Sequence, residues 1–391
     1  MSSIGALASL EHRWLLVCLR AVGKGQVPPA PPAALDWERL LELADIESLR
    51  PALAHAVERL DGVPADARRR LALDLAAGAG RHLMMTRELA ALLRHCAHQG
   101  LDVIVLKGPV LADRVYPQPA LRPFSDLDLL VRAADRFRAD AVLRAHGLRR
   151  VADDHSWEFD LTWDGATLYE TPSGVRIDLH WALLTEPRFA WSPDEAGLWE
   201  RSVPIMILET MARGLGREDH LLYLAAHLAV HHALTGLLHV WDVALLLERE
   251  LHAFDWEVVV ARAASWRVSH ALYFVLRAVR RTFAAPVPVS ALSALRPAGP
   301  RAALLAALVA RGDREWLVRL ERLVALLLVD RTRDLYRPLR RALLPPASWM
   351  RARYDPTASR PALYRAHWRR LRGMVGGAAL ALVRGGRTQH S

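Results

Sequence analysis

Two aspartates stand two residues apart in the segment 122–131, which reads RPFSDLDLLV. Because side chains on a strand alternate between its two faces, Asp126 and Asp128 share one face, while Leu127 and Leu129 point to the other, toward a core. Two neighbouring carboxylates repel each other unless a cation lies between them. The spacing therefore predicts a divalent cation site, and Mg²⁺ (or Mn²⁺) suits hard oxygen ligands while leaving positions for phosphate and water.

A third carboxylate lies in a second strand-like segment, where Asp178 and His180 share a face by the same alternation. If this strand lies beside that of Asp126, the three carboxylates converge. Such a cluster suits two-metal phosphoryl or nucleotidyl transfer, in which one metal activates the attacking oxygen and the other holds the leaving pyrophosphate. His180 is open to two interpretations, a packed core histidine or a contact near Asp178.

A phosphate-binding turn is predicted upstream, where the apolar run 103–106 ends at Lys107 and Gly108. Glycine lets the backbone approach a phosphate closely, and the start of the following helix offers unpaired N–H groups. Lys107 is one of two lysines in the chain, the other being Lys24. A lysine is a compact charge suited to a triphosphate, although it could also be a solvated turn residue.

Other residues leave alternatives open. Arg122 either contacts nucleotide phosphate or pairs with Asp126 in a structural role. His227 and His231 share a helix face with the i, i+4 spacing of zinc ligands, and His232 follows them. Since no H-E-x-x-H pattern is present, we interpret these histidines as core or acceptor-pocket residues.

The surrounding pattern predicts an α+β protein, with a small mixed-sheet unit between two helical regions. The expected regions are a helical segment at 1–100, the α/β core at 101–187, a helical domain at 188–330 and a basic tail at 331–391. Apolar residues at three- and four-residue spacing predict helices at 7–19, 37–60, 65–99, 110–115, 133–145, 218–232, 237–251, 255–267, 269–281 and 301–329. Short apolar or alternating runs predict strands at 103–106, 127–131, 157–163, 167–170 and 175–183.

The net charge of +10, from 52 Lys+Arg and 42 Asp+Glu, is unevenly distributed. The tail carries 14 Arg against Asp334 and Asp355, a local +12, so the first 330 residues sum to −2. This is not the footprint of a nucleic-acid-binding body. The tail could make weak contacts with an anionic surface through its Arg and aromatic residues, or be a solvated extension, and its prolines predict short helices at most.

Composition also bears on the folding of the protein, the state of its cysteines and its cellular location. A hydrophobic fraction of 52% excludes wholesale disorder. Cys18 and Cys96 lie in apolar helical patterns and are expected to be buried thiols rather than a disulfide framework. No signal peptide or spanning segment is apparent, so we expect a cytoplasmic protein. The absence of Asn and near-absence of Lys favour a GC-rich bacterial source.

The motifs together resemble an uncharacterised bacterial nucleotidyltransferase family of the DNA-polymerase-beta-like superfamily. The resemblance rests on LKG at 106–108, YP at 116–117, LRPFSDLDLL at 121–130, IDLHW at 177–181, DHLL at 219–222, WD at 241–242 and PPASWMRARY at 345–354. It implies that Asp126, Asp128 and Asp178 bind metal and that Asp178 helps to deprotonate an acceptor hydroxyl. The superfamily usually has Gly-Ser or Gly-Gly after its first strand, so here phosphate contact would shift to Lys107 or Arg122.

The function implied is transfer of a nucleoside monophosphate from an NTP to an acceptor. Lys107, Gly108, Arg122 and Ser125 would hold the triphosphate. The acceptor, a small molecule, glycan or peptide natural product, stays open, as does the choice of NTP, and a tailoring role in polysaccharide or natural-product biosynthesis is implied. The alternatives are a metal-dependent glycosyltransferase that uses Asp-x-Asp, and a non-catalytic nucleotide-binding adaptor.

Overall fold

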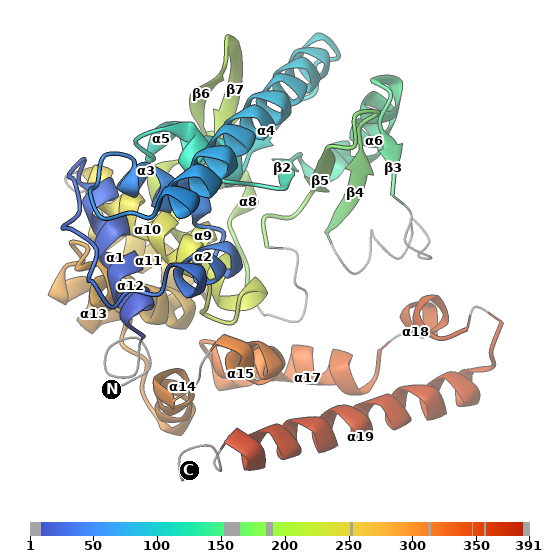
Figure 1. The fold of residues 1–391 in the computed structure, drawn as a ribbon. Coiled ribbons are helices and arrows are strands. Elements are labelled where there is room, and N and C mark those ends of the chain that lie inside the picture. The colour runs from blue at the N-terminus through green and yellow to red at the C-terminus, as the bar shows by residue number, and fades with distance from the viewer. Residues whose placement is uncertain are drawn as a thin grey trace.

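The computed structural model describes residues 9–151, 165–184, 191–250, 253–311, 314–345, 347–355 and 357–385 (Figure 1). Among these residues, four helices precede the sheet: α1 (Leu10–Gly23), α2 (Trp37–Ile46), α3 (Arg50–Val57) and α4 (Ala65–His98). The single helix predicted over 37–60 is divided, because Ser48 adopts a positive φ of 57° between α2 and α3. The long helix α4 extends from the N-terminal helices to the sheet.

A mixed sheet of seven strands forms the centre, in the order β3-β4-β5-β2-β1-β7-β6. The strands are β1 (Ile104–Val105), β2 (Asp126–Leu130), β3 (Arg149–Arg150), β4 (Ala166–Glu170), β5 (Arg176–His180), β6 (Val203–Ile207) and β7 (Thr210–Gly214). The β2–β5 and β1–β7 pairs are parallel, and the other neighbouring pairs are antiparallel. The predicted α+β class with a small mixed sheet between helical regions is therefore confirmed.

The sheet differs from the expected one at its ends. The prediction that the chain returns to helix after residue 187 is wrong for the β6–β7 hairpin, since β7 pairs with β1 and continues the sheet beyond the predicted end of the α/β core. Leu208 takes a positive φ of 52° in the hairpin turn, where no glycine signals it. The strand predicted at 157–163 lies outside the described residues.

Short helices connect the strands. They are α5 (Gly108–Arg114), η1 (Pro119–Leu121), η2 (Ala133–Asp135), α6 (Arg136–Ala145) and α8 (Glu195–Glu200). After the sheet the chain forms α9 (Arg217–His231), α10 (Leu237–Arg249), α11 (Trp256–Trp266), α12 (Ser269–Phe283), α13 (Val289–Leu295), α14 (Pro300–Arg311), α15 (Arg314–Arg319) and α16 (Glu321–Leu327). The helix predicted at 301–329 is thus divided into three.

The tail holds η4 (Thr332–Leu335), α17 (Tyr336–Leu343), α18 (Ala347–Arg353) and α19 (Arg360–Gly385). The prediction of short helices at most is wrong for α19, which has 26 residues and lies along α15 and α18 (Figure 1). Pro361 does not interrupt α19, because a proline in the first helical turn loses no intrahelical hydrogen bond. Among the described residues, no helix combines the length and apolarity that crossing a membrane requires.

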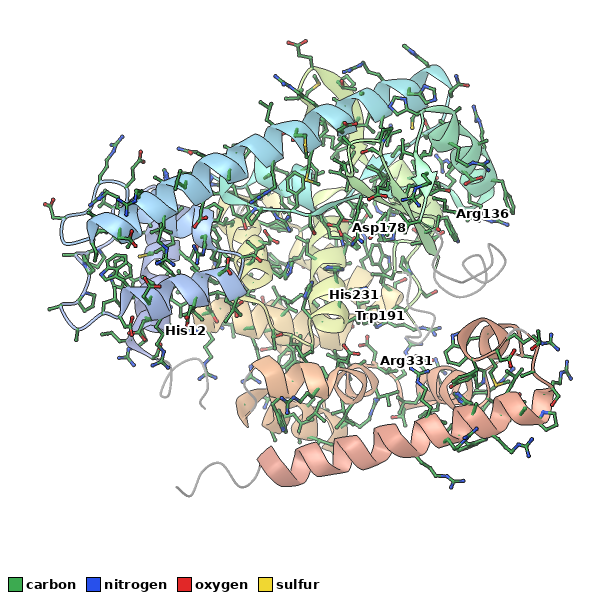
Figure 2. All side chains as sticks on the ribbon, turned by 45° about the vertical axis from the view of Figure 1, so that its right-hand side comes forward. His12, Arg136, Asp178, Trp191, His231 and Arg331 are labelled. Atoms are coloured by element: carbon green, nitrogen blue, oxygen red, sulfur yellow. The ribbon has the colours of Figure 1, made fainter. Side chains whose placement is uncertain are left out.

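Two apolar clusters hold the sheet between helices. One joins α1–α3 to α9–α12, and Cys18 is buried in it; the other lies between the sheet and helices α4 and α6, and includes Cys96. Leu127, Leu129, Ile177 and Leu179 of β2 and β5 are fully buried in the second cluster. Because strand side chains alternate, the intervening residues of β2 and β5 face the opposite side, toward α9 (Figure 2).

Candidate active site

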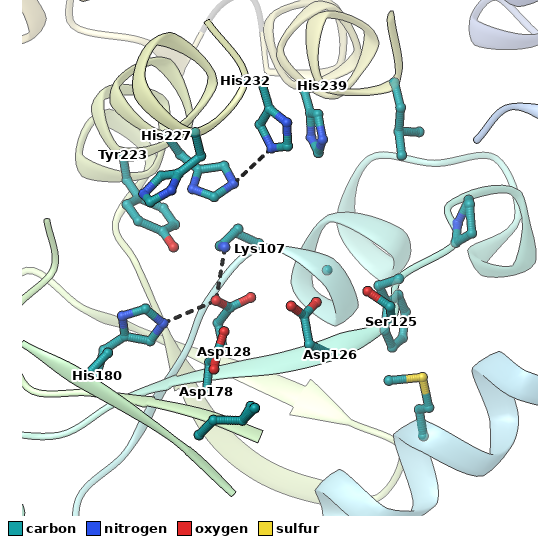
Figure 3. A pocket seen from close by; sticks show the side chains of 18 of the residues that line it. Lys107, Ser125, Asp126, Asp128, Asp178, His180, Tyr223, His227, His232 and His239 are labelled. Atoms are coloured by element: carbon teal, nitrogen blue, oxygen red, sulfur yellow. Dashed lines mark hydrogen bonds and ion pairs between the residues drawn. The ribbon is translucent and has the colours of Figure 1, made fainter. Parts of the chain in front are cut away.

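Asp128 and Asp178 are paired across the parallel strands β2 and β5. The predicted adjacency of these strands is therefore confirmed. Ligand atoms of Asp128, Asp178 and His180 all lie within 4.8 Å of one another (Figure 3). Asp126 lies on the same face of β2 beside this compact group.

Burial and mutual repulsion govern the ionisation of the carboxylates. Burial and the charge of Asp128 raise the pKa of Asp126. Burial also raises the pKa of Asp178, where repulsion from Asp128 and Asp126 opposes attraction to His180. At Asp128, burial is outweighed by Lys107 and His180, which hold its pKa below the usual range. In the protein without a cation, the positive groups near Asp126 and Asp178 therefore do not offset the cost of ionising these two carboxylates.

The donor set fits a divalent cation. Carboxylate oxygens are the ligands that Mg²⁺ prefers, and a dication would offset the burial and the mutual repulsion that raise the pKa of Asp126 and Asp178. His180 adds one imidazole nitrogen, with Nε2 3.1 Å from Asp128 Oδ1. Of the two interpretations of His180, the structure supports a contact near the carboxylates, because its ring lies beside Asp128.

Lys107 reaches into this cluster from the turn between β1 and α5. Its Nζ lies 2.9 Å from Asp128 Oδ1, and its side chain is only 15% exposed, so it is not a solvated turn residue. The backbone φ at Lys107 is +38°, in a region that non-glycine residues rarely adopt and that is often found at functional sites.

Gly108, the next residue, begins α5 in tight surroundings. A Cβ placed on it would lie 3.1 Å from the Cβ and Cγ atoms of Phe124 and 3.4 Å from Arg122 Nη1. Its lack of a side chain therefore keeps the turn close to the segment that leads into β2. Ser125 of that segment is exposed and lines the same cavity.

Arg122 pairs with Asp242 of α10 and not with Asp126, so the alternative pairing is wrong. The guanidinium is bidentate, with Nε 2.9 Å from Oδ1 and Nη2 2.8 Å from Oδ2 of Asp242. The Tyr116 hydroxyl donates to Asp242 Oδ1 at 2.6 Å. Both charged groups are buried, so this pair joins the segment before β2 firmly to the helical domain.

All the site residues predicted from sequence line one cavity of about 1020 Å³. Its lining includes Lys107, Gly108, Arg122, Ser125, Asp126, Asp128 and Asp178. Across from the carboxylates it is lined by Tyr223, His227, His231, His232 and His239 of α9, α10 and the turn between them. His239 was not singled out from sequence, although its i, i+3 spacing to Asp242 was a usable signal.

The fold and the site agree with the class of protein expected from the motifs. Carboxylates on adjacent parallel strands of a mixed sheet lie beside a lysine-containing strand-to-helix turn. A protein family described as "Uncharacterised nucleotidyltransferase" matches residues 33–284. The chain belongs to this uncharacterised nucleotidyltransferase family, which confirms the resemblance stated from the motifs.

Other comparisons add little detail. A solution structure of the antibiotic-resistance factor ANT(2'')-Ia matches 51% of this chain and 98% of its own chain, at 16% identity and a TM-score of 0.34. No protein of curated function matches the chain significantly.

Proposed function

We propose that the protein transfers a nucleoside monophosphate from an NTP to the hydroxyl group of an acceptor, with Mg²⁺ or Mn²⁺ as the cofactor. The observation that carries the proposal is the pairing of Asp128 with Asp178 across adjacent parallel strands, with Lys107 2.9 Å from Asp128. Asp126, Asp128 and Asp178 are the proposed metal ligands. When bound, the metal would supply positive charge that polarises the α-phosphate and stabilises the leaving pyrophosphate.

Asp178 is the proposed proton acceptor. Its raised pKa suits a carboxylate that takes a proton from the acceptor hydroxyl as the oxygen attacks the α-phosphorus. The new bond joins that oxygen to the α-phosphorus, the bond from the α-phosphorus to the bridging oxygen breaks, and pyrophosphate leaves with the bridging oxygen. The proton from the hydroxyl then resides on Asp178.

Lys107, Gly108, Arg122 and Ser125 are the proposed contacts to the triphosphate. Lys107 would exchange part of its contact with Asp128 for phosphate oxygens, and the absence of a side chain at Gly108 would let a phosphate approach the backbone of the turn. Arg122 is held by Asp242 through Nε and Nη2, so its Nη1, near Gly108, is the nitrogen that faces this turn.

The two alternative functions find less support. A glycosyltransferase that uses Asp-x-Asp would place a doubly wound nucleotide-binding unit before the motif, whereas the described residues before β1 form helices. A non-catalytic adaptor has no need of three clustered carboxylates, two of which have a pKa raised by burial and by the charge of their neighbours. A nucleotidyltransferase, in contrast, would use the clustered carboxylates to bind its metal ion.

Labelled nucleotides test the proposal. NTPs labelled at the α- or the γ-phosphate are incubated in parallel with the protein, Mg²⁺ and a bacterial small-molecule and glycan extract. The proposal predicts α-label in an acceptor and γ-label in pyrophosphate, both lost in Asp128→Ala. Transfer of the γ-label to an acceptor would contradict it, because that outcome identifies phosphoryl transfer.

A further inference from the structure

A cluster of imidazoles faces the carboxylates across the cavity (Figure 3). His227 and His232 approach with their Nε2 atoms 3.3 Å apart, and the rings of His232 and His239 stack with centroids separated by 3.9 Å. We call His227, His232 and His239 the imidazole wall. All three are half-buried and line the cavity, and Lys107 lies between them and Asp128.

The turn between α9 and α10 holds this wall in an unusual backbone conformation. Ala233 and Leu234 have φ values of 48° and 62°, followed by Gly236 at 94°. A left-handed conformation is unfavourable for a non-glycine residue, so packing must maintain it. This turn allows the ring of His232, which directly follows α9, to stack on the ring of His239 in the first turn of α10.

The cavity is electrostatically divided. The described carboxylates that line it are Asp126, Asp128 and Asp178, all on the sheet, whereas the opposite side presents imidazoles. The titratable and charged groups around the wall are Lys107, Arg122, Tyr223, His231, Asp242 and Glu47. Asp242 lies 3.6 Å from His239, and Glu47, which follows α2, accepts a hydrogen bond from the N–H of Leu237 at the start of α10. Burial, followed by the positive charge of Lys107 and of the neighbouring histidines, holds the pKa of His227 well below its usual value.

We propose that the imidazole wall and Lys107 form the subsite for the pyrophosphate part of the nucleotide, between the carboxylates and α9. This inference rests on the proposed function and assigns residues that bind the leaving pyrophosphate. Imidazole N–H groups donate to phosphate oxygens, and an anion placed between Lys107 and the wall would favour the protonated ring. Asp242 would orient His239 through Nδ1, just as it holds Arg122 on the other side.

A zinc site is a weaker interpretation of the same histidines. Among the described residues, the only group whose ligand atoms all lie within 4.8 Å of one another is Asp128, Asp178 and His180. The three wall imidazoles do not converge on one point in that way. Their ring centroids lie 3.9 to 6.1 Å apart, so separate rings can donate to different oxygens of a diphosphate.

Calorimetric titration with Mg²⁺-pyrophosphate and with each Mg²⁺-NTP tests the subsite. The variants are His227→Gln, His232→Gln and His239→Gln, with His98→Gln, exposed at the end of α4, as the control. We expect each wall variant to weaken the binding of both ligands by on the order of tenfold, the value of one charge-assisted hydrogen bond. Using three separate positions guards against one variant that fails to fold.

Titration of the wild type in two buffers of different ionisation enthalpy gives a second readout. We expect net proton uptake on pyrophosphate binding near pH 7.5, which His227→Gln reduces and His98→Gln does not. Wall variants that bind both ligands as the wild type does would overturn the subsite and leave the proposed function standing. A wild type that binds neither ligand would overturn both.

Discussion

Asp128 and Asp178 lie directly opposite each other on the parallel strands β2 and β5, although they are 50 positions apart in the chain. Both carboxylates stand on the central strands of a sheet whose other face is fully buried at Leu127, Leu129 and Leu179. Strands position side chains more precisely than loops do. The carboxylates are thus held in position before any ligand binds, and their mutual repulsion destabilises the folded protein.

Asp126→Asn is expected to stabilise the metal-free protein while it abolishes nucleotide-dependent activity. The folded-state pKa of Asp126 is raised, so its ionisation opposes folding, and this penalty grows as the pH rises above the usual aspartate pKa of about 3.9. We expect a rise in melting temperature of about 2 °C at pH 7.5 that shrinks toward pH 4. A variant that melts below the wild type at pH 7.5 would contradict this account.

Asp242→Asn is expected to destabilise the protein by about 3–5 kcal/mol, because it leaves the buried guanidinium of Arg122 without a counter-charge. Denaturant unfolding measures the loss. Asp66→Asn, at an exposed ion pair of α4, is the matched control and should cost less than about 1 kcal/mol. Equal losses in the two variants would show that the Arg122–Asp242 pair does not anchor the helical domain.

Gly108→Ala is expected to weaken NTP binding with little effect on stability. Its new Cβ would press on Phe124 at 3.1 Å and shift the turn that carries Lys107. We expect a loss of affinity of about fivefold or more, since small displacements at a phosphate site are costly. Gly80→Ala on α4, where nothing lies within 4 Å of the added Cβ, should bind NTP normally and be slightly more stable. Unchanged NTP binding by Gly108→Ala would show that this turn does not contribute to the nucleotide-binding site.

Lys107→Gln is expected to lower NTP affinity by at least about tenfold, because a desolvated ammonium–phosphate contact is lost. It should also raise the pKa of Asp128, since Lys107 is the strongest group that lowers it. The other lysine of the chain, Lys24, is exposed at the end of α1, and Lys24→Gln is therefore the natural control. Calorimetry measures the affinities, and equal affinities in the two variants would contradict the role of Lys107.

The central part of the site could be predicted from sequence because it depends on local regularities. Alternation along a strand places Asp126 and Asp128 on one face, and the same rule joins Asp178 to His180. Lys107 stood out because lysine is so rare in this chain. The helices predicted at 7–19 and 65–99 also match, since their apolar spacing extends over many turns, whereas the one predicted at 37–60 is divided.

Other features depend on contacts that no local pattern encodes. The partner of Arg122 is Asp242, 120 positions away, so the chain offers a nearer but incorrect candidate in Asp126. The β6–β7 hairpin turns at Leu208 without the usual glycine signal. The convergence of His232 and His239 requires the left-handed turn at Ala233 and Leu234, which sequence does not announce.

Calorimetric titration of Mg²⁺-NTP into the wild type and into Asp128→Asn tests the central claim most directly. We expect the wild type to bind at least one of the four NTPs, and this binding to depend on Mg²⁺ or Mn²⁺. We also expect Asp128→Asn to lose this binding while its fold, as judged by circular dichroism, is unchanged. Absence of binding of all four NTPs to the wild type, or binding that survives in Asp128→Asn without a divalent ion, would contradict it.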